Sequence, residues 1–352
     1  MPEFLSEEVL VALVGLVGGV MLGLAARLGR FCTMGAIEDL LYGGSSIRMR
    51  MWALAIGVAV IGSFALSAAG LMTTESSYYL SIRWMPLASI LGGLIFGYGM
   101  ALAGNCGFGS IARLGGGDLR AFVIVLVMGV SAYVVLSGPL APVRVWLFPQ
   151  QDVVNDMPPG LAHLLGDWTG LSINLLGVLI GVGIALAALA SRDFLANRQA
   201  IFWSGVVGVA IASGWVGSHW VASTGFADIQ VVSHSFSAPV GESLLYFMTA
   251  SARAPSFAVG SVAGVILGAF IGSLVKGHFR WEACEDPREL RRQITGAALM
   301  GAGAVLALGC TVGQGLSAFS VLAYSAPVTF LAIFAGAAFG LRQLIEGFQP
   351  AE

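Results

Sequence analysis

Residues 296–317, GAALMGAGAVLALGCTVGQGLS, decide the fold of this chain because they repeat an earlier stretch. Placed over residues 92–113, GGLIFGYGMALAGNCGFGSIAR, at a constant offset of 204, they share seven identities in 22 positions without a gap. The matched pairs include Cys106 with Cys310 and Gly109 with Gly313, although the chain has only four cysteines. The match indicates an internal repeat that covers an apolar run and the polar residues that end it.

The composition places this repeat in a lipid bilayer. Of the 352 residues, 57% are hydrophobic and 10% are charged, and the mean hydropathy is +0.87. A soluble domain carries roughly 25% charged residues, so this chain cannot cover a soluble surface. Apolar runs of about 20 residues match the roughly 30 Å of hydrocarbon that a helix must cross. We therefore expect one integral membrane domain over residues 1–352, of the all-α polytopic class.

Nine apolar runs predict about nine transmembrane helices. The first is expected to be a retained span, because it lacks the preceding basic stretch of a cleaved signal peptide. Five prolines in the segment 139–170 predict an irregular exterior loop there. The predicted helices cover residues 8–29, 51–71, 86–104, 120–138, 171–190, 200–218, 255–275, 293–309 and 326–342.

The basic side chains orient these helices, because Arg and Lys are retained on the cytoplasmic side of a membrane. With the N-terminus outside and the C-terminus in the cytoplasm, 14 of the 17 basic residues are cytoplasmic, and only Arg83, Arg144 and Arg253 are exterior. The two repeat copies then cross in opposite directions. We expect an inverted repeat of four, one and four helices, with halves at residues 8–138 and 200–342 and a connecting helix at 171–190. That arrangement is typical of transporters.

Three of the four cysteines share one local pattern, in which a glycine stands three residues after the cysteine. Each lies at the end of an apolar run, where glycines allow a helix to break and turn back into the membrane. Short stretches after the cysteines predict re-entrant helices at residues 36–42, 110–114 and 314–319. Cys284 lacks the pattern. The motifs are Cys32-Thr33-Met34-Gly35, Cys106-Gly107-Phe108-Gly109 and Cys310-Thr311-Val312-Gly313.

The chemistry open to three buried thiols is narrowed by what the sequence lacks. A net charge of −2 without a basic stripe excludes nucleic-acid binding. Copper and zinc sites usually add histidine or Cys-x-x-Cys ligands, and the sequence has no Cys-x-x-Cys pair. A disulfide relay would need such a pair or exposed exterior thiols. We therefore expect no metal and no cofactor. A polarizable lining for a soft, sulfur-containing solute remains. A membrane thiol-disulfide oxidoreductase, a passive channel for a neutral solute and a structural subunit stay open as alternatives.

At these motifs the sequence resembles the YeeE/YedE sulfur-transport family, which includes bacterial thiosulfate importers and members assigned to selenium or other sulfur compounds. The resemblance covers nearly the whole chain. It implies an hourglass-shaped protein of the bacterial inner membrane, not an enzyme, that passes thiosulfate inward by transient S–H hydrogen bonds from Cys32, Cys106 and Cys310. It also implies a small cytosolic sulfurtransferase, TusA-like, as a partner. The matching segments are residues 29–36, GRFCTMGA, 104–109, GNCGFG, 113–115, RLG, and 309–317, GCTVGQGLS.

The solute path is expected to lack fixed charge, because no Arg or Lys lies in the middle of a predicted span. Neutral thiols and the N-terminal N–H groups of the short helices would then receive the dianion. The polar residues beside the cysteines are expected either to donate further hydrogen bonds to the anion or only to cap helices. Arg30 and Arg113 are expected either to attract the anion as it emerges or only to anchor the topology. Residues 214–223, after the sixth predicted helix, hold no cysteine to match Cys32. The supporting residues are Thr33, Gly35, Asn105, Gly109, Thr311, Gly313, Gln314, Ser317, Arg30 and Arg113.

Overall fold

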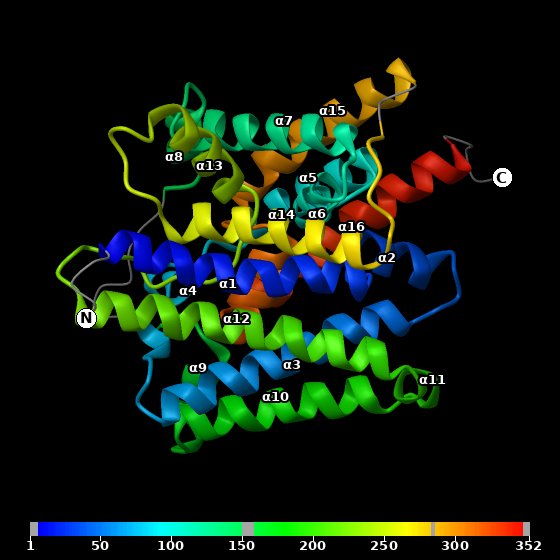
Figure 1. The fold of residues 1–352 in the computed structure, drawn as a ribbon. Coiled ribbons are helices and arrows are strands. Elements are labelled where there is room, and N and C mark those ends of the chain that lie inside the picture. Colours follow the sequence, from blue (N-terminus) through cyan, green and yellow to red (C-terminus); the bar gives the residue numbers. More distant parts are fainter. Residues whose placement is uncertain (1–5, 150–157, 283–285, 348–352) are drawn as a thin grey trace.

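The computed structural model describes residues 6–149, 158–282 and 286–347. In these ranges the chain is helical and its only extended pairings are isolated bridges. The long helices lie side by side in one bundle (Figure 1). The prediction of an all-α polytopic membrane protein is confirmed, while Cys284 lies outside the described residues.

All nine predicted positions hold a long helix. Seven are long and apolar enough to cross a membrane, or eight if α9 (Leu161–Thr169) and α10, which meet at a bend of 120°, form one broken span. α10 has only 17 residues, and α15 begins with a charged turn, so the count of nine crossing helices stays a prediction. The nine are α1 (Glu7–Leu28), α3 (Ile47–Ala68), α5 (Pro86–Ala103), α7 (Leu119–Leu136), α10 (Ile173–Leu189), α12 (Arg198–Thr224), α14 (Phe257–Val275), α15 (Pro287–Leu306) and α16 (Ser325–Glu346).

A short helix follows each of the three cysteine motifs, as the pattern predicts. α2 (Thr33–Leu41) follows α1, α6 (Gly107–Gly115) follows α5, and the third lies at 311–320, wound as a π-helix over Gly313–Ala318 (η2). Two residues before each cysteine the backbone is left-handed, with φ of 55° at Arg30, 74° at Gly104 and 56° at Leu308. That conformation costs an L-residue roughly 1–2 kcal/mol, so packing must hold Arg30 and Leu308 in it.

Two expectations about the connections are wrong. The segment 139–170, where it is described, is not irregular, because it contains α8 (Ala141–Leu147) and α9. The sixth long helix, α12, continues to Thr224 instead of ending near residue 218. The chain therefore breaks later than expected, over residues 225–237, before the short helix α13 (Ala238–Thr249).

Helices α5 and α15 meet backbone to backbone through paired glycines. A Cβ atom at Gly99 would lie 2.6 Å from the Gly296 carbonyl oxygen, and one at Gly296 would lie 2.5 Å from the Gly99 oxygen. Gly92 and Gly303 exchange the same contact at 2.8 Å in both directions. Small residues allow this approach where lipid supplies no hydrophobic drive for helix association. Because Gly92 aligns with Gly296 and Gly99 with Gly303 in the repeat, each copy contacts the other reciprocally.

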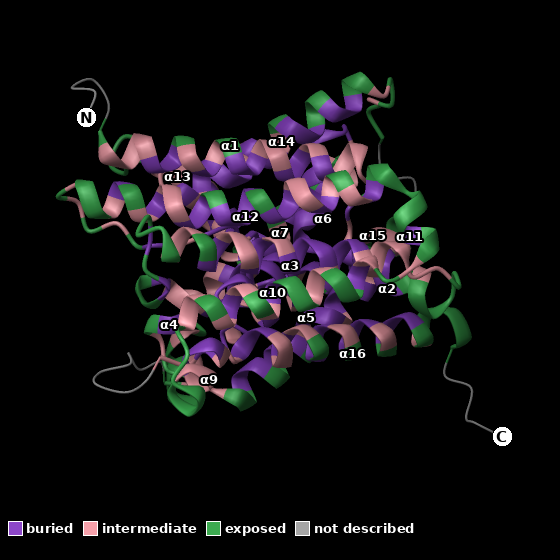
Figure 2. Cartoon of the chain, turned by 90° about the horizontal axis from the view of Figure 1, so that it is seen from below, coloured by how far each residue is buried: buried purple, intermediate pink, exposed green. Residues whose placement is uncertain are grey.

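The outer face of the bundle is apolar. Leu179 and Leu186 of α10 are 55% and 62% exposed, and Leu331 of α16 is 67% exposed. Figure 2 shows buried residues collected in the middle of the bundle and exposed ones along its outer helices and connections. An aqueous surface does not tolerate so many large apolar groups, whereas acyl chains pack against them without cost.

Candidate functional site

Cys32 and Cys106 occupy the N-caps of α2 and α6, and Cys310 directly precedes the helix at 311–320. The Cys106 sulfur accepts a hydrogen bond from the Gly109 amide at 3.3 Å, and the Cys310 sulfur accepts one from the Gly313 amide at 3.5 Å. N-cap side chains normally reach the amide three residues on, so the spacing in Cys-x-x-Gly is that of helix capping. Both sulfurs are fully buried, whereas Cys32 is half-buried.

The first two motifs meet in space although 73 residues separate them in the chain. The Cys32 thiol donates to Asn105 Oδ1 at 3.6 Å, and the Thr33 hydroxyl donates to the Cys106 sulfur at 3.9 Å. Thr33 and Asn105, both expected as supporting residues, therefore lie between these two thiols.

Phe236 connects the third motif to the second. Its amide donates to the Cys310 sulfur at 3.3 Å, and the neighbouring Ser235 hydroxyl lies 3.8 Å from the same sulfur. The Phe236 ring centroid is 5.2 Å from that of Phe108, two residues after Cys106. The segment 225–237, which contains no cysteine, thus contacts two of the three motifs.

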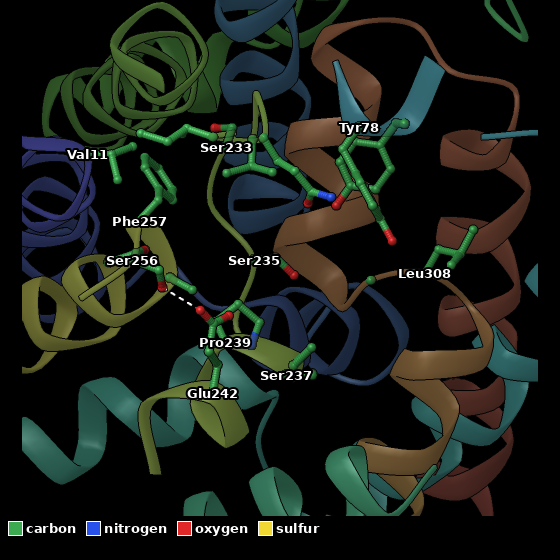
Figure 3. Close-up of a pocket in the computed structure, with 18 of the residues that line it drawn as sticks. Val11, Tyr78, Ser233, Ser235, Ser237, Pro239, Glu242, Ser256, Phe257 and Leu308 are labelled. Carbon is green, nitrogen blue, oxygen red and sulfur yellow. Dashed lines mark hydrogen bonds between the residues drawn. The ribbon is translucent and has the colours of Figure 1, made fainter. Parts of the chain in front are cut away.

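A cavity of about 460 Å³ opens on the Cys310 side of this cluster. Its lining includes the hydroxyl-bearing side chains of Tyr79, Ser233, Ser235 and Ser237, together with Gly309. The three serines are labelled in Figure 3. Its described lining also includes Glu8, Asp228 and Glu242 but no Arg or Lys, and we call it the acidic vestibule. Burial raises the pKa of the Tyr79 phenol well above its usual range, so that group stays a neutral donor.

A second cavity of about 410 Å³ opens beside Cys32 and Asn105. Its lining carries one carboxylate, Glu38, and five cationic side chains, so we call it the basic vestibule. The five are Arg27, Arg30, Arg48, Arg113 and Lys276.

Three of those cations are committed to other groups. Arg48 pairs with Asp39 at 3.1 Å, Arg27 donates to the Ser273 hydroxyl at 2.7 Å, and Lys276 donates to the Arg27 carbonyl at 2.9 Å. Among the described residues, no carboxylate lies within 4.0 Å of the Arg30 or Arg113 guanidinium. These two predicted residues therefore supply the uncommitted positive charge next to Cys32.

The two vestibules lie toward opposite ends of the bundle. Glu8 of the acidic vestibule and Arg27 of the basic one stand 19 residues apart on α1, which is about 28 Å along a helix. The two cavities share no lining residue. Between them lie the buried side chains of Cys106, Phe108 and Phe236, which line neither cavity. In this conformation a solute could not pass without movement of that layer.

The glycine of each motif lies against a polar group of the site. A Cβ at Gly35 would collide with Arg48 Nη1, and one at Gly109 would lie 3.0 Å from Asn105 Oδ1. One at Gly313 would lie 2.7 Å from the Ser235 hydroxyl and 2.9 Å from the Tyr79 hydroxyl. A larger residue at any of the three positions would displace a group that lines a vestibule.

The remaining supporting residues lie in the helix at 311–320. Gln314 donates from Nε2 to the Ala307 carbonyl at 2.8 Å, and the Ser317 hydroxyl donates to the His234 carbonyl at 2.6 Å. The Thr311 hydroxyl is fully buried. These bonds tie the helix at 311–320 to the end of α15 and to the segment before α13.

Sequence reasoning missed Ser235, Ser237 and Tyr79. The available signal was SHSFS at residues 233–237, a dense polar run for this chain, but without a cysteine it did not match the motif. No three His, Cys, Asp or Glu side chains gather as metal ligands in the part of the chain that is described. The site consists of thiols, hydroxyls and amides between two charged vestibules.

Comparison with known proteins places this arrangement in a family. Residues 28–339 match the family described as sulphur transport. The thiosulfate transporter TsuA of Escherichia coli (strain K12) is 26% identical over 312 residues, which cover 86% of this chain and 86% of that protein. The thiosulfate transporter TsuA of Spirochaeta thermophila is 26% identical over 321 residues, covering 88% and 92%.

Proposed function

This chain belongs to the sulphur transport family, and we propose that it imports thiosulfate across the bacterial inner membrane. The family and the two relatives indicate a membrane transporter rather than an enzyme. Thiosulfate is the solute that the names of both relatives state. The N-out, C-in topology predicted from the basic residues would put the acidic vestibule outside and the basic one in the cytoplasm.

One observation supports the proposed mechanism: the three thiols are placed in order from the side of the acidic vestibule to the side of the basic one. The Cys310 sulfur lies 3.8 Å from the hydroxyl of Ser235, which lines the acidic vestibule. Cys106 is buried in the middle, and Cys32 lines the basic vestibule. Thiosulfate would pass Cys310, Cys106 and Cys32 in turn, receiving a hydrogen bond from each S–H group. Each donor is weak, so the solute can leave as readily as it binds.

The donors must be neutral for this to work. A thiolate would repel the dianion, and a fixed cation in the layer of buried side chains would bind it too tightly to release it. The N-termini of α6 and of the helix at 311–320 add amide dipoles at Cys106 and Cys310. The anion then meets fixed positive charge only at the end, where Arg30 and Arg113 line the basic vestibule.

A cytosolic acceptor would complete the process. A small sulfurtransferase of the TusA-like kind, docked at the basic side, would remove thiosulfate as it emerges. Consumption of the solute there keeps its cytoplasmic concentration low and favours net import.

The test is uptake of labelled thiosulfate by a bacterial strain without other sulfur importers. Cys106→Ala removes the central donor and is expected to abolish uptake while the protein remains folded and inserted. Cys284→Ala removes the cysteine outside the motifs and should transport normally. Sulfate and selenium oxyanions added as competitors define the solute class. Normal uptake by the Cys106→Ala protein would falsify the thiol mechanism.

A further inference from the structure

The two halves of the chain exchange their packing partners in a regular way. α1 packs against α14 and α3 packs against α12, while α2 contacts α16 and α13 contacts α7. Together with the reciprocal glycine contacts of α5 and α15, this exchange is what a two-fold relation between the halves would produce. Under that relation α13 is the counterpart of α2, and the segment before α13 is the counterpart of the segment before α2.

The sequences of those two segments agree with this correspondence. Arg30-Phe31-Cys32 precedes α2, and Ser235-Phe236-Ser237 precedes α13. The two phenylalanines are both buried, at 2% and 0% exposure. Cys32 and Ser237 are both N-cap residues, at an offset of 205 that differs by one from the repeat. The second half therefore does have a counterpart of Cys32, and it is a serine that lies beyond the stretch 214–223.

The Ser237 hydroxyl is not used in the way that an N-cap serine usually is. It makes no capping bond to its own helix, although such a bond is the normal reason for serine at this position. Its side chain is buried, at 1% exposure, and its hydroxyl lies 3.9 Å from the Met128 thioether sulfur, a weak acceptor. A buried O–H with so poor a partner is available to bind something else.

The hydroxyl also stands at a junction of the path. On one side Ser237 lines the acidic vestibule, beside Ser235 (Figure 3). On the other side its oxygen would lie 3.7 Å from a Cβ at Gly107, the residue that follows Cys106. The Ser237 hydroxyl thus lies between the acidic vestibule and the first turn of α6, which follows Cys106.

We infer that Ser237 is a fourth solute-path residue, which donates a hydrogen bond to an oxygen of a sulfur oxyanion as it passes from Cys310 to Cys106. This inference rests on the proposed function. Hydroxyl donors make shorter and stronger bonds to anionic oxygens than thiols do, and thiols suit the polarizable terminal sulfur. A path with one hydroxyl among three thiols can hold both ends of thiosulfate at once.

The test compares three variants in the labelled-thiosulfate uptake assay, each normalised to the amount of protein in the membrane. Ser237→Ala should raise the KM and lower uptake at low solute concentration by about tenfold, the loss of one hydrogen bond. Ser237→Cys replaces the hydroxyl with a thiol, the donor that Cys32 supplies in the other half, and should keep about half of the native rate. The matched control is Ser243→Ala, on the same helix, because the Ser243 hydroxyl donates to the Pro239 carbonyl at 2.7 Å and does not line the vestibule.

The outcomes separate this inference from the proposed function. Uptake by the Ser237→Ala protein within about twofold of native overturns the inference, and the thiol mechanism still stands if Cys106→Ala abolishes uptake. If Cys106→Ala also transports normally, both ideas fail. Should Ser237→Ala not reach the membrane, Ser237→Cys decides, since a folded Ser237→Cys protein without uptake contradicts a donor role.

Discussion

The two vestibules are similar in size and opposite in charge. The acidic one, of about 460 Å³, has three carboxylates and no described cation in its lining, whereas the basic one, of about 410 Å³, has five cations and one carboxylate. A passage defined by size alone would need no such contrast. For an anionic solute, Coulomb attraction operates only at the basic end, so recognition at the acidic end depends on neutral hydroxyl and thiol donors. Under the proposed function, selection and release would take place at different ends of the bundle.

Reversing the free charge of the basic vestibule should break this contrast most strongly. The double variant Arg30→Glu with Arg113→Glu replaces the two uncommitted cations beside Cys32 with carboxylates. We expect thiosulfate uptake to fall roughly a hundredfold, because a dianion would leave Cys32 against a negative field. Uptake by cells that express equal amounts of inserted protein measures the effect.

Arg192→Glu is the matched control for charge, since Arg192 is exposed on α11 (Arg192–Ala196) and does not line the vestibule. Arg113→Gln removes charge without reversing it and should show an intermediate loss. If the double variant transports as well as the Arg192→Glu protein, the basic vestibule has no part in release.

Adding one methyl group at Gly313 should disturb the donors at the acidic end. The new Cβ would lie 2.7 Å from the Ser235 hydroxyl and 2.9 Å from the Tyr79 hydroxyl, so both groups beside Cys310 must shift. We expect Gly313→Ala to lower uptake by about tenfold. Thiosulfate uptake as a function of concentration separates a rise in KM from a loss of inserted protein.

Gly205→Ala provides the comparison, because a Cβ at Gly205 of α12 has open space and meets no atom within 4 Å. That variant should behave as the native protein does. Equal behaviour of the two variants would count against a site at this position.

Neutralising the acidic vestibule should have the smallest effect, and in the opposite direction. In Asp228→Asn with Glu242→Gln, two carboxylates that repel an approaching dianion become amides of the same size. Uptake at low ionic strength should rise about threefold, and the gain should shrink in high salt because ions screen exposed charges. Asp193→Asn, exposed on α11, is the control. A loss of uptake would mean that these carboxylates assist the solute instead of repelling it.

The helices and the cysteine motifs could be predicted from the sequence, because apolar length and the Cys-x-x-Gly spacing are local properties. The conformation two residues before each cysteine could not, since Arg30 and Leu308 are not residues that favour a left-handed backbone. The basic vestibule was found only in part. Arg27, Arg48 and Lys276 belong to different segments of the chain, and only tertiary packing brings them beside Arg30 and Arg113.

The segment 225–237, between α12 and α13, shows the same limit more sharply. Ser237 lies 13 residues beyond the end of α12 at Thr224, and its relation to Cys32 depends on which helices pack against α2 and α13. Composition does not reveal that relation, because the second segment contains no cysteine. A buried phenylalanine between two serines carries the correspondence instead.

The layer of aromatic rings and thiols between the vestibules has a consequence for the energy supply of the cell. Phe108 and Phe236 are buried together with Cys106 and line neither cavity, and the two cavities have no lining residue in common. In this conformation these side chains fill the space that a continuous, proton-conducting file of water would need. A cell could therefore hold many copies of this protein at rest without discharging its membrane potential.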